Sequence, residues 1–256
     1  MSRLRARCPD CRTLTAVALG PEYQCHSCGR EFAAGLVRVP RAWGTDGEPM
    51  AEAAFLAVPY PEASVIEEET LAEQTAALAA DLPERPLVLG GCCCAHVGAV
   101  TGLAARPGGR LALVWLDAHG DLNTPETSLS GNPWGMPLRR LLDSGAVAAE
   151  DVALVGARAL DPAERTFAAE HGLDDDVGRA LTGAERVYVA VDLDVLRPGE
   201  AAVFMPEPGG RTVAEAEELL RSIAATLPIA GVGISGGLPD PANVAVVGRV
   251  TAALGL

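Results

Sequence analysis

Residues 110–121 read RLALVWLDAHGD, an apolar run that passes directly into an acidic turn. A continuous apolar run is typical of a strand that is buried on both faces, as the strands of a parallel sheet are. A second segment, RVYVAVDLDV at residues 186–195, repeats the pattern. In parallel sheets the functional side chains gather at the carboxyl ends of the strands, which is where both acidic turns fall. The two segments therefore predict a parallel sheet with a site at one end of its strands.

Further strands and helices alternate on either side of these segments. Helical periodicity is present at residues 69–82, 96–106, 137–145, 161–172 and 212–227. Apolar runs of strand length occur at residues 86–91, 151–158 and 229–235. This alternation predicts an α/β fold with helices on both faces of the sheet. A chain of 256 residues has room for one such domain and a small appendage.

The appendage is indicated by two Cys-x-x-Cys pairs near the N-terminus, separated by thirteen residues. Each pair can offer two thiolates from one tight turn, and two turns on a hairpin complete a tetrahedral site. The segment between the pairs, TLTAVALGPEYQ, is typical of two short strands joined by a turn at Gly20-Pro21. About thirty residues are too few to build a sufficient core, so a metal is expected to stabilise this unit. We predict a zinc ribbon at residues 1–35, holding one Zn²⁺ in a structural role, followed by an α/β domain at residues 36–256. The predicted zinc ligands are Cys8, Cys11, Cys25 and Cys28.

Composition excludes several classes of function. The net charge of −14 argues against nucleic acid as the main partner. No stretch approaches the ~20 apolar residues of a membrane span, and no secretion signal is evident, so we expect a cytoplasmic protein with no membrane partner. Seven cysteines then indicate thiols and metal sites rather than disulfides. The chain contains no lysine, which excludes lysine Schiff bases and a Walker-type phosphate site.

The acidic turns have the composition of a metal site. Asp117, His119 and Asp121 alternate along one turn, and Asp192 and Asp194 along the other. If the extended geometry of the strands continues, each set projects to one side. Carboxylates converging in one pocket would repel one another unless a cation were bound, and this number of oxygens suits two divalent ions. Carboxylate-rich ligation favours Mn²⁺. The alternative is that these residues are strand-end caps and solvated loop acids.

From about Pro86 onward the chain resembles the arginase/agmatinase family of ureohydrolases. The segment DAHGDLNTPETSLSGNPWGMP at residues 117–137 is similar to a metal-binding and substrate-binding stretch of that family. VDLDVLRP and VGARALDPAE resemble two further motifs. The resemblance implies a three-layer α/β/α fold with a parallel sheet, and hydrolysis of a guanidino group with release of urea. It also implies a homo-oligomer.

The same resemblance assigns the cysteines of VLGGCCCAHVGAV, residues 88–100. The family has Gly-Gly-Asp-His here, so Cys93 replaces a histidine that binds the first metal. A thiolate is a legitimate ligand, and a helix N-terminus lowers a thiol's pKa. His96 is a rival ligand or a partner of one, whereas Cys92 and Cys94 read as small buried apolar residues. The implied first site is Cys93, Asp117, Asp121 and Asp192. The implied second site is His119, Asp117, Asp192 and Asp194, and Asp121 is the implied catalytic residue that moves a proton.

Substrate recognition is implied in part. By resemblance, an amino-acid carboxylate is held by Asn123, Ser130 and Asn132, and an ammonium group by Asp161 and Glu164. The alternatives are ordinary turn chemistry for the first three residues and a helix cap for the last two.

Three departures bear on the substrate. Trp134 stands where the family has a proton-shuttling histidine, and Gly236 lies where a guanidinium-binding glutamate is expected. Glu207 occupies a segment that differs from the family's pattern. We therefore predict a modified arginine such as N-hydroxyarginine, whose leaving group needs less help, in preference to arginine. Trp134 could stack on the flat guanidine group or serve only in packing.

Two competing hypotheses remain. One is a non-catalytic or regulatory protein that uses its zinc ribbon to dock a partner. The other is a different metal hydrolase such as a deacetylase, which the scarcity of histidines disfavours because the chain has only four.

Overall fold

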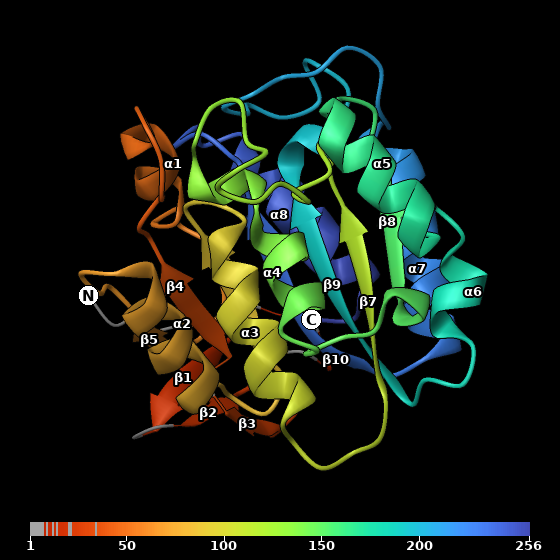
Figure 1. Ribbon diagram of the computed structural model, residues 1–256. Helices are drawn as coiled ribbons and strands as arrows, with labels where there is room; N and C mark the ends of the chain where they lie inside the picture. The colour runs from red at the N-terminus through yellow and green to blue at the C-terminus, as the bar shows by residue number, and fades with distance from the viewer. Residues whose placement is uncertain (1–7, 9, 12, 14, 20–21, 34) are drawn as a thin grey trace.

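A computed structural model describes residues 8, 10, 11, 13, 15–19, 22–33 and 35–256 (Figure 1). Its centre is a sheet of seven parallel strands in the order β5-β4-β6-β10-β9-β7-β8. The strands are β4 (Leu36–Val39), β5 (Glu62–Val65), β6 (Leu87–Gly90), β7 (Leu111–Leu116), β8 (Val152–Val155), β9 (Arg186–Asp192) and β10 (Ile229–Ser235). The predicted parallel sheet is confirmed.

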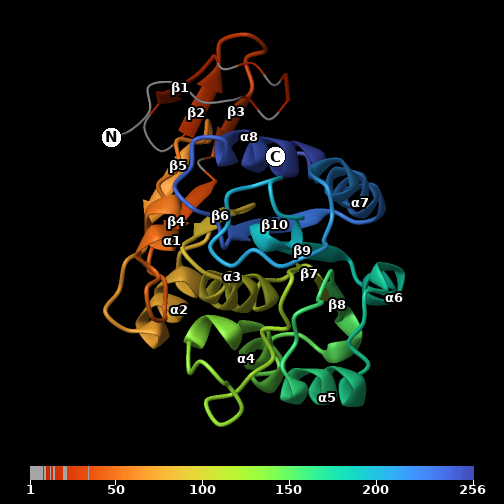
Figure 2. The ribbon, with the colours of Figure 1, turned by 90° about the horizontal axis from the view of Figure 1, so that it is seen from above.

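Helices cover both faces of this sheet, so the fold has the three layers that were predicted (Figure 2). One apolar core joins the sheet to α6, α7 and α8, and the other joins it to α2, α3, α4 and α5. The helices are α1 (Glu48–Ala53), α2 (Leu71–Ala80), α3 (Cys94–Ala104), α4 (Pro137–Asp143), α5 (Pro162–His171), α6 (Val177–Leu181), α7 (Val213–Thr226) and α8 (Asn243–Ala253).

Local sequence explains where the predicted helices begin. Thr70 caps α2 and Thr212 caps α7, each by accepting the backbone N–H three residues on. A glutamate at that third position returns the hydrogen bond, which completes a capping box at both helices. The short elements α1, α6, β4 and β5, and also α8, were not predicted.

The N-terminal unit contains the two predicted strands, β1 (Ala16–Leu19) and β2 (Glu22–Cys25), which pair antiparallel. A third strand, β3 (Glu31–Ala33), adds to β2. The turn predicted at residues 20–21 lies outside the described residues. Because β3 ends just before β4 begins, this unit lies near the amino ends of the large sheet's strands, away from the acidic turns (Figure 1). Among the helices that the structure describes, each is too short or too polar to span a bilayer.

Candidate metal centre

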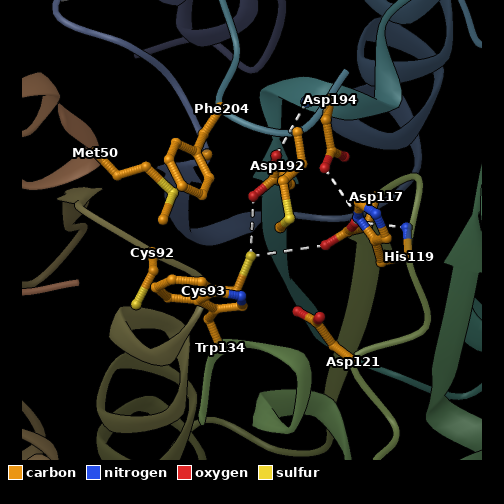
Figure 3. Close-up of a pocket in the computed structure, with 12 residues that line it drawn as sticks. Met50, Cys92, Cys93, Asp117, His119, Asp121, Trp134, Asp192, Asp194 and Phe204 are labelled. Carbon is orange, nitrogen blue, oxygen red and sulfur yellow. Dashed lines mark hydrogen bonds and ion pairs between the residues drawn. The ribbon is translucent and has the colours of Figure 1, made fainter. Parts of the chain in front are cut away.

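The acidic motifs meet where neighbouring central strands end. Cys93 follows β6, Asp117 follows β7 and Asp192 ends β9, so their side chains converge from strands far apart in the sequence (Figure 3). The turn after β6 depends on glycine, because a Cβ on Gly91 would overlap the backbone of Pro40. This close approach places Cys93 at the start of α3, with its side chain toward the carboxylates.

One candidate ligand group consists of Cys93, Asp117 and Asp192, all buried. The Cys93 Sγ lies 3.0 Å from Oδ2 of Asp192 and 3.6 Å from Oδ2 of Asp117. The three ligand atoms lie within 4.8 Å of one another, which is close enough for a single ion to reach them all. Thiolate and carboxylate oxygen are both ligands of divalent transition metals.

A second candidate group consists of Asp117, His119 and Asp194. The His119 Nδ1 lies 2.9 Å from Oδ2 of Asp194 and 3.4 Å from Oδ1 of Asp117. Asp117 therefore turns one oxygen to each group, as a carboxylate that bridges two ions would. On the other side of the imidazole, Nε2 lies 3.6 Å from Oε1 of Glu207.

The electrostatics of the two groups call for a cation. Burial and then the charge of a neighbouring carboxylate raise the pKa of Asp192 to about 7 and that of Asp194 to about 6. Burial and then the Asp192 charge also raise the pKa of Asp117 and hold that of the Cys93 thiol well above its usual range. Burial alone would lower the pKa of His119, but its hydrogen bonds to Asp117 and Asp194 raise it to about 12. Without a metal the site thus retains protons, and divalent ions could replace them.

Asp121 supplies an independent sign that the donor set fits a metal. Its side chain lines the same cavity, is 4% exposed, and has an Oδ2 atom without a hydrogen-bond partner. A buried carboxylate oxygen is rarely left unpaired unless an ion or a proton occupies that position. Its backbone φ of 53° lies in the left-handed region, which aspartate adopts more readily than most residues.

The expectation that extended geometry continues through this turn is wrong. Strand β7 ends at Leu116, and the Asp117 side chain accepts the backbone N–H of His119 at 2.7 Å. This local hydrogen bond bends the chain out of the strand direction. His119 therefore points toward Asp194, and Asp121 approaches the cavity separately, from the side of Cys93 (Figure 3).

The cavity over the carboxylates is small and has an apolar cover. About 20 Å³ is open to the centre of a water molecule, which is room for roughly one water. Met50, Trp134 and Phe204 line the side opposite the metal groups. The Trp134 and Phe204 rings meet edge to face, with centroids 5.9 Å apart. Trp134 is 7% exposed, so its role in this conformation is packing.

The predicted substrate residues separate into two places. Asn123 Nδ2 donates to Asp161 Oδ2 at 2.9 Å, so these two meet. Asn132 accepts the backbone N–H of Thr45 with its side-chain oxygen, and Ser130 is exposed in the same loop. Among the described residues, the cavity lining includes Trp134 but none of these four.

Glu164 has the structural role that the helix-cap alternative predicted. It is 3% exposed, and its two carboxylate oxygens accept the backbone N–H groups of Leu122 and Asp161, at 2.9 and 2.8 Å. It thus joins the start of α5 to the turn that follows Asp121.

The other residues of the cysteine segment are buried as well. Cys92 and Cys94 pack with Met50 and Trp134 in a small apolar cluster, as small apolar residues do. His96 belongs to neither candidate ligand group; its ring nitrogens face other side chains, Ser235 and Tyr188.

In the N-terminal unit the four predicted cysteines come together. Sγ atoms of Cys8 and Cys28, and of Cys11 and Cys25, are each 3.5 Å apart. All four sulfur atoms lie within 4.8 Å of one another, which is close enough for one tetrahedrally coordinated ion to bind them all.

Comparisons with known proteins agree with this geometry. The family model described as "Arginase family" matches residues 50–240. The chain belongs to the arginase family. It is 33% identical over 169 residues to an arginase of Bacillus caldovelox, covering 54% of this chain and 56% of that protein. It is 36% identical over 154 residues to an arginase of Bacillus subtilis strain 168, covering 49% of this chain and 52% of that protein.

The crystal structure of the Bacillus caldovelox arginase is similar with a TM-score of 0.72 and 25% identity, covering 86% of this chain and 97% of that one. In the sequence alignments, however, the chain spans only about half the length of the curated arginases that it matches.

The structure gives a physical reason for one departure from the arginase pattern, the absence of a glutamate at Gly236. Gly236 cannot carry the expected glutamate, because even a Cβ there would overlap the Asp192 carboxylate. Sequence reasoning missed Met50, Phe204 and Ser235, which lie outside the recognised motifs. For Ser235 a signal did exist, since it is the last residue of an apolar strand and the site lies at the carboxyl ends of the strands.

Proposed function

We propose that the chain is a binuclear-metal amidinohydrolase that acts on the guanidino group of arginine or a modified arginine such as N-hydroxyarginine. The products would be an amine and urea or a urea derivative. The observation that carries this proposal is the pair of ligand groups that share Asp117, in which every residue but the partly buried His119 is buried. Membership of the arginase family supports the same class of reaction.

The ligands of the proposed centre come from the three turns that follow β6, β7 and β9. The first metal would be held by Cys93, Asp117, Asp121 and Asp192, and the second by His119, Asp117, Asp192 and Asp194. The ions are two divalent metals, with Mn²⁺ favoured by the excess of carboxylates. When bound, they would supply Lewis acidity and lower the pKa of an attacking water.

Asp121 is the residue that we propose moves the proton. Its unpaired Oδ2 faces the cavity, and burial followed by the Asp117 charge holds its pKa well above the usual range. A carboxylate in this position can accept a proton from water and return it to a departing nitrogen. Asn123, Asp161 and the loop at residues 130–132 remain candidates for holding the amino-acid end of the substrate, and Glu164 would act there only through Asp161.

The preference for a modified guanidine rests on two residues. Trp134 offers no proton shuttle, and Gly236 offers no carboxylate for a guanidinium. A substrate whose leaving group is already activated, such as an N-hydroxyguanidine, depends less on both.

Residues 1–35 form, in this proposal, a separate zinc ribbon that precedes the hydrolase domain at residues 36–256. The four converging thiols fit one Zn²⁺ and leave no open position for a water, which favours a structural role. All seven cysteines are free thiols, in keeping with a reducing cytoplasm.

The test is urea release by the Mn²⁺-loaded protein from N-hydroxyarginine and from arginine. We expect turnover of N-hydroxyarginine to exceed that of arginine. Asp121→Asn preserves the shape but removes the proton carrier, and should lower turnover by about 10²–10⁴-fold. Asp81→Asn, at an exposed position after α2, is the matched control and should change nothing. Faster turnover of plain arginine would refute the preference for modified guanidines.

A non-catalytic protein that docks a partner through its ribbon is the second candidate. The cavity favours it, because room for roughly one water does not admit a guanidine. If the protein binds both divalent metals and still releases no urea from any guanidine, the amidinohydrolase proposal is refuted and this second candidate is favoured over it.

A further inference from the structure

Behind the candidate first metal site lies a chain of three buried polar side chains that the proposed reaction does not use. His96, Ser235 and Tyr188 are each at most 2% exposed. Oγ of Ser235 lies 3.1 Å from Nε2 of His96, and the Tyr188 hydroxyl lies 3.1 Å from Nδ1 on the other side of the ring. The Ser235 oxygen also lies 3.2 Å from the Cys93 sulfur and 3.2 Å from Oδ2 of Asp192.

We propose that Tyr188, His96 and Ser235 form a directional hydrogen-bond relay that positions Cys93 and Asp192 as ligands of the first metal. The proposal rests on the proposed metal centre and deepens it. The three are positioning residues, since they act on the metal only through its ligands.

The direction of the relay follows from counting donors and acceptors. His96 is fully buried and its ring nitrogens face two hydroxyls rather than a carboxylate, so its imidazole is neutral and carries one N–H and one bare nitrogen. If Nε2 carries the hydrogen, it donates to Ser235, and Tyr188 donates to Nδ1. The Ser235 hydroxyl is then free to donate to the sulfur of Cys93 or to Asp192, and every hydrogen has an acceptor.

The opposite tautomer leaves the network incomplete. With the hydrogen on Nδ1, His96 would donate to Tyr188, whose own hydrogen would have no acceptor within reach among the described residues. Ser235 would have to donate to Nε2 and so turn its hydrogen away from Asp192. Buried polar hydrogens are almost always paired, which selects the tautomer with hydrogen on Nε2.

The relay matters because of what else surrounds the sulfur. Among the described residues, Cys93 has side-chain hydrogen-bond contacts with Asp117, Asp192 and Ser235, and the Ser235 hydroxyl is the group among these three that can donate to the sulfur. A thiolate between two carboxylates needs such a donor as well as the metal. Partners of this kind fix the orientation of a ligand and raise its affinity for the ion.

The surrounding backbone accommodates the relay. A Cβ on Gly233 of β10 would overlap both the Tyr188 hydroxyl and the His96 ring, so this strand position provides the space for their contact. Trp115 packs edge-on against the His96 ring, with centroids 5.2 Å apart and an interplanar angle of 83°. The same tryptophan donates Nε1–H to Asp117 at 3.2 Å, which ties the ring to a second ligand.

The test uses Co²⁺, because thiolate ligation produces a near-ultraviolet charge-transfer band that is read without turnover. The four ribbon thiolates would also give such a band with Co²⁺, so the Cys93 band is defined as the part of the parent spectrum that Cys93→Ser loses. Ser235→Ala and His96→Leu should lower affinity for the Co²⁺ ion that gives the Cys93 band by about 10–100-fold, with a smaller effect on the second Co²⁺, which shares Asp192. His96→Gln keeps a side-chain amide that can donate to Ser235, and should recover part of the affinity.

The tautomer is tested on the unmodified protein by nitrogen NMR of the histidine rings, so the test does not depend on any variant folding. A buried ring with hydrogen on Nε2 supports the relay, and hydrogen on Nδ1 overturns it. Unchanged Co²⁺ affinity in both Ser235→Ala and His96→Leu would overturn it too. Urea release is a separate readout. The Co²⁺ results can support the relay in a protein that hydrolyses no guanidine, and a protein that releases urea but shows no difference in this band between the parent and Cys93→Ser would refute only the relay.

Discussion

Removing the metals should make the folded chain less stable as the pH rises, which is a direct consequence of burying so many carboxyls together. The perturbation is chelation of all divalent ions, followed by a change from about pH 5 to about pH 8. The pKa of Asp192 is raised from 3.8 to about 7, by burial first and by the Asp194 charge second. At about 1.4 kcal/mol per pKa unit, this difference corresponds to about 4 kcal/mol for Asp192 alone.

The sign follows from which state binds protons more tightly. Between about pH 4 and pH 7 the folded chain holds a proton on Asp192 that the unfolded chain has released. The free energy of unfolding therefore falls as the pH rises through this window. His119 acts in the same direction above about pH 6.5, because its folded pKa of about 12 also exceeds its ordinary value.

The assay is urea unfolding of metal-free protein across this range, followed by circular dichroism. Asp192→Asn replaces the carboxyl with a neutral group of the same shape, so at about pH 8 this variant should be more stable than the parent by up to about 4 kcal/mol. Reloading with Mn²⁺ should flatten the profile, since the ions replace the protons. If the free energy of unfolding of the metal-free protein stays level or rises from pH 5 to pH 8, the pKa of Asp192 is not raised in the folded state, and the reasoning is refuted.

Three further predictions concern single side chains. Cys93→Ser should bind one fewer of the two metals proposed for the hydrolase domain, and Cys93→His should bind both. Elemental analysis counts the ions per chain, and an unchanged count in Cys93→Ser would exclude ligation by sulfur. Glu164→Ala should lower the free energy of unfolding by about 2–5 kcal/mol, because two backbone N–H groups lose their acceptor; a loss below about 1 kcal/mol in urea unfolding contradicts this. Gly44→Ala should destabilise the fold by about 1–3 kcal/mol and displace the Trp134 ring, which a Cβ there would overlap; tryptophan fluorescence that matches the parent would contradict the displacement.

The sheet and the carboxylates of the metal groups could be predicted because the information is local. Asp117 and Asp192 each come directly after a buried apolar strand, and topology alone brings the ends of parallel strands together. The path of the turn after Asp117 could not be predicted in the same way. It is set by one side-chain hydrogen bond to His119 and by the left-handed backbone of Asp121, neither of which changes the residue pattern.

The sequence alone also could not decide between two roles for a residue that fits both. Glu164 fits a capping box and a substrate-binding motif equally well, and only its two backbone contacts show that its oxygens are already occupied. Met50 and Phe204 carry no chemical signature, and they reach the cavity from segments about 150 residues apart. Their contribution depends on tertiary packing, for which a single sequence holds no periodic signal.

The apolar cover is what links the two proposed functions. Met50, Trp134 and Phe204 close the cavity to a space for roughly one water, so a guanidine can reach the metals only if part of this cover moves. Closing the site also excludes bulk water, which strengthens every interaction between the ions and their ligands. Catalysis would thus require part of this cover, for instance the Trp134 ring that contacts Phe204, to move, whereas metal binding would not. Gly44→Ala separates these demands because it acts on Trp134 without touching a ligand: it should raise guanidine turnover in an enzyme and weaken metal retention in a non-catalytic protein.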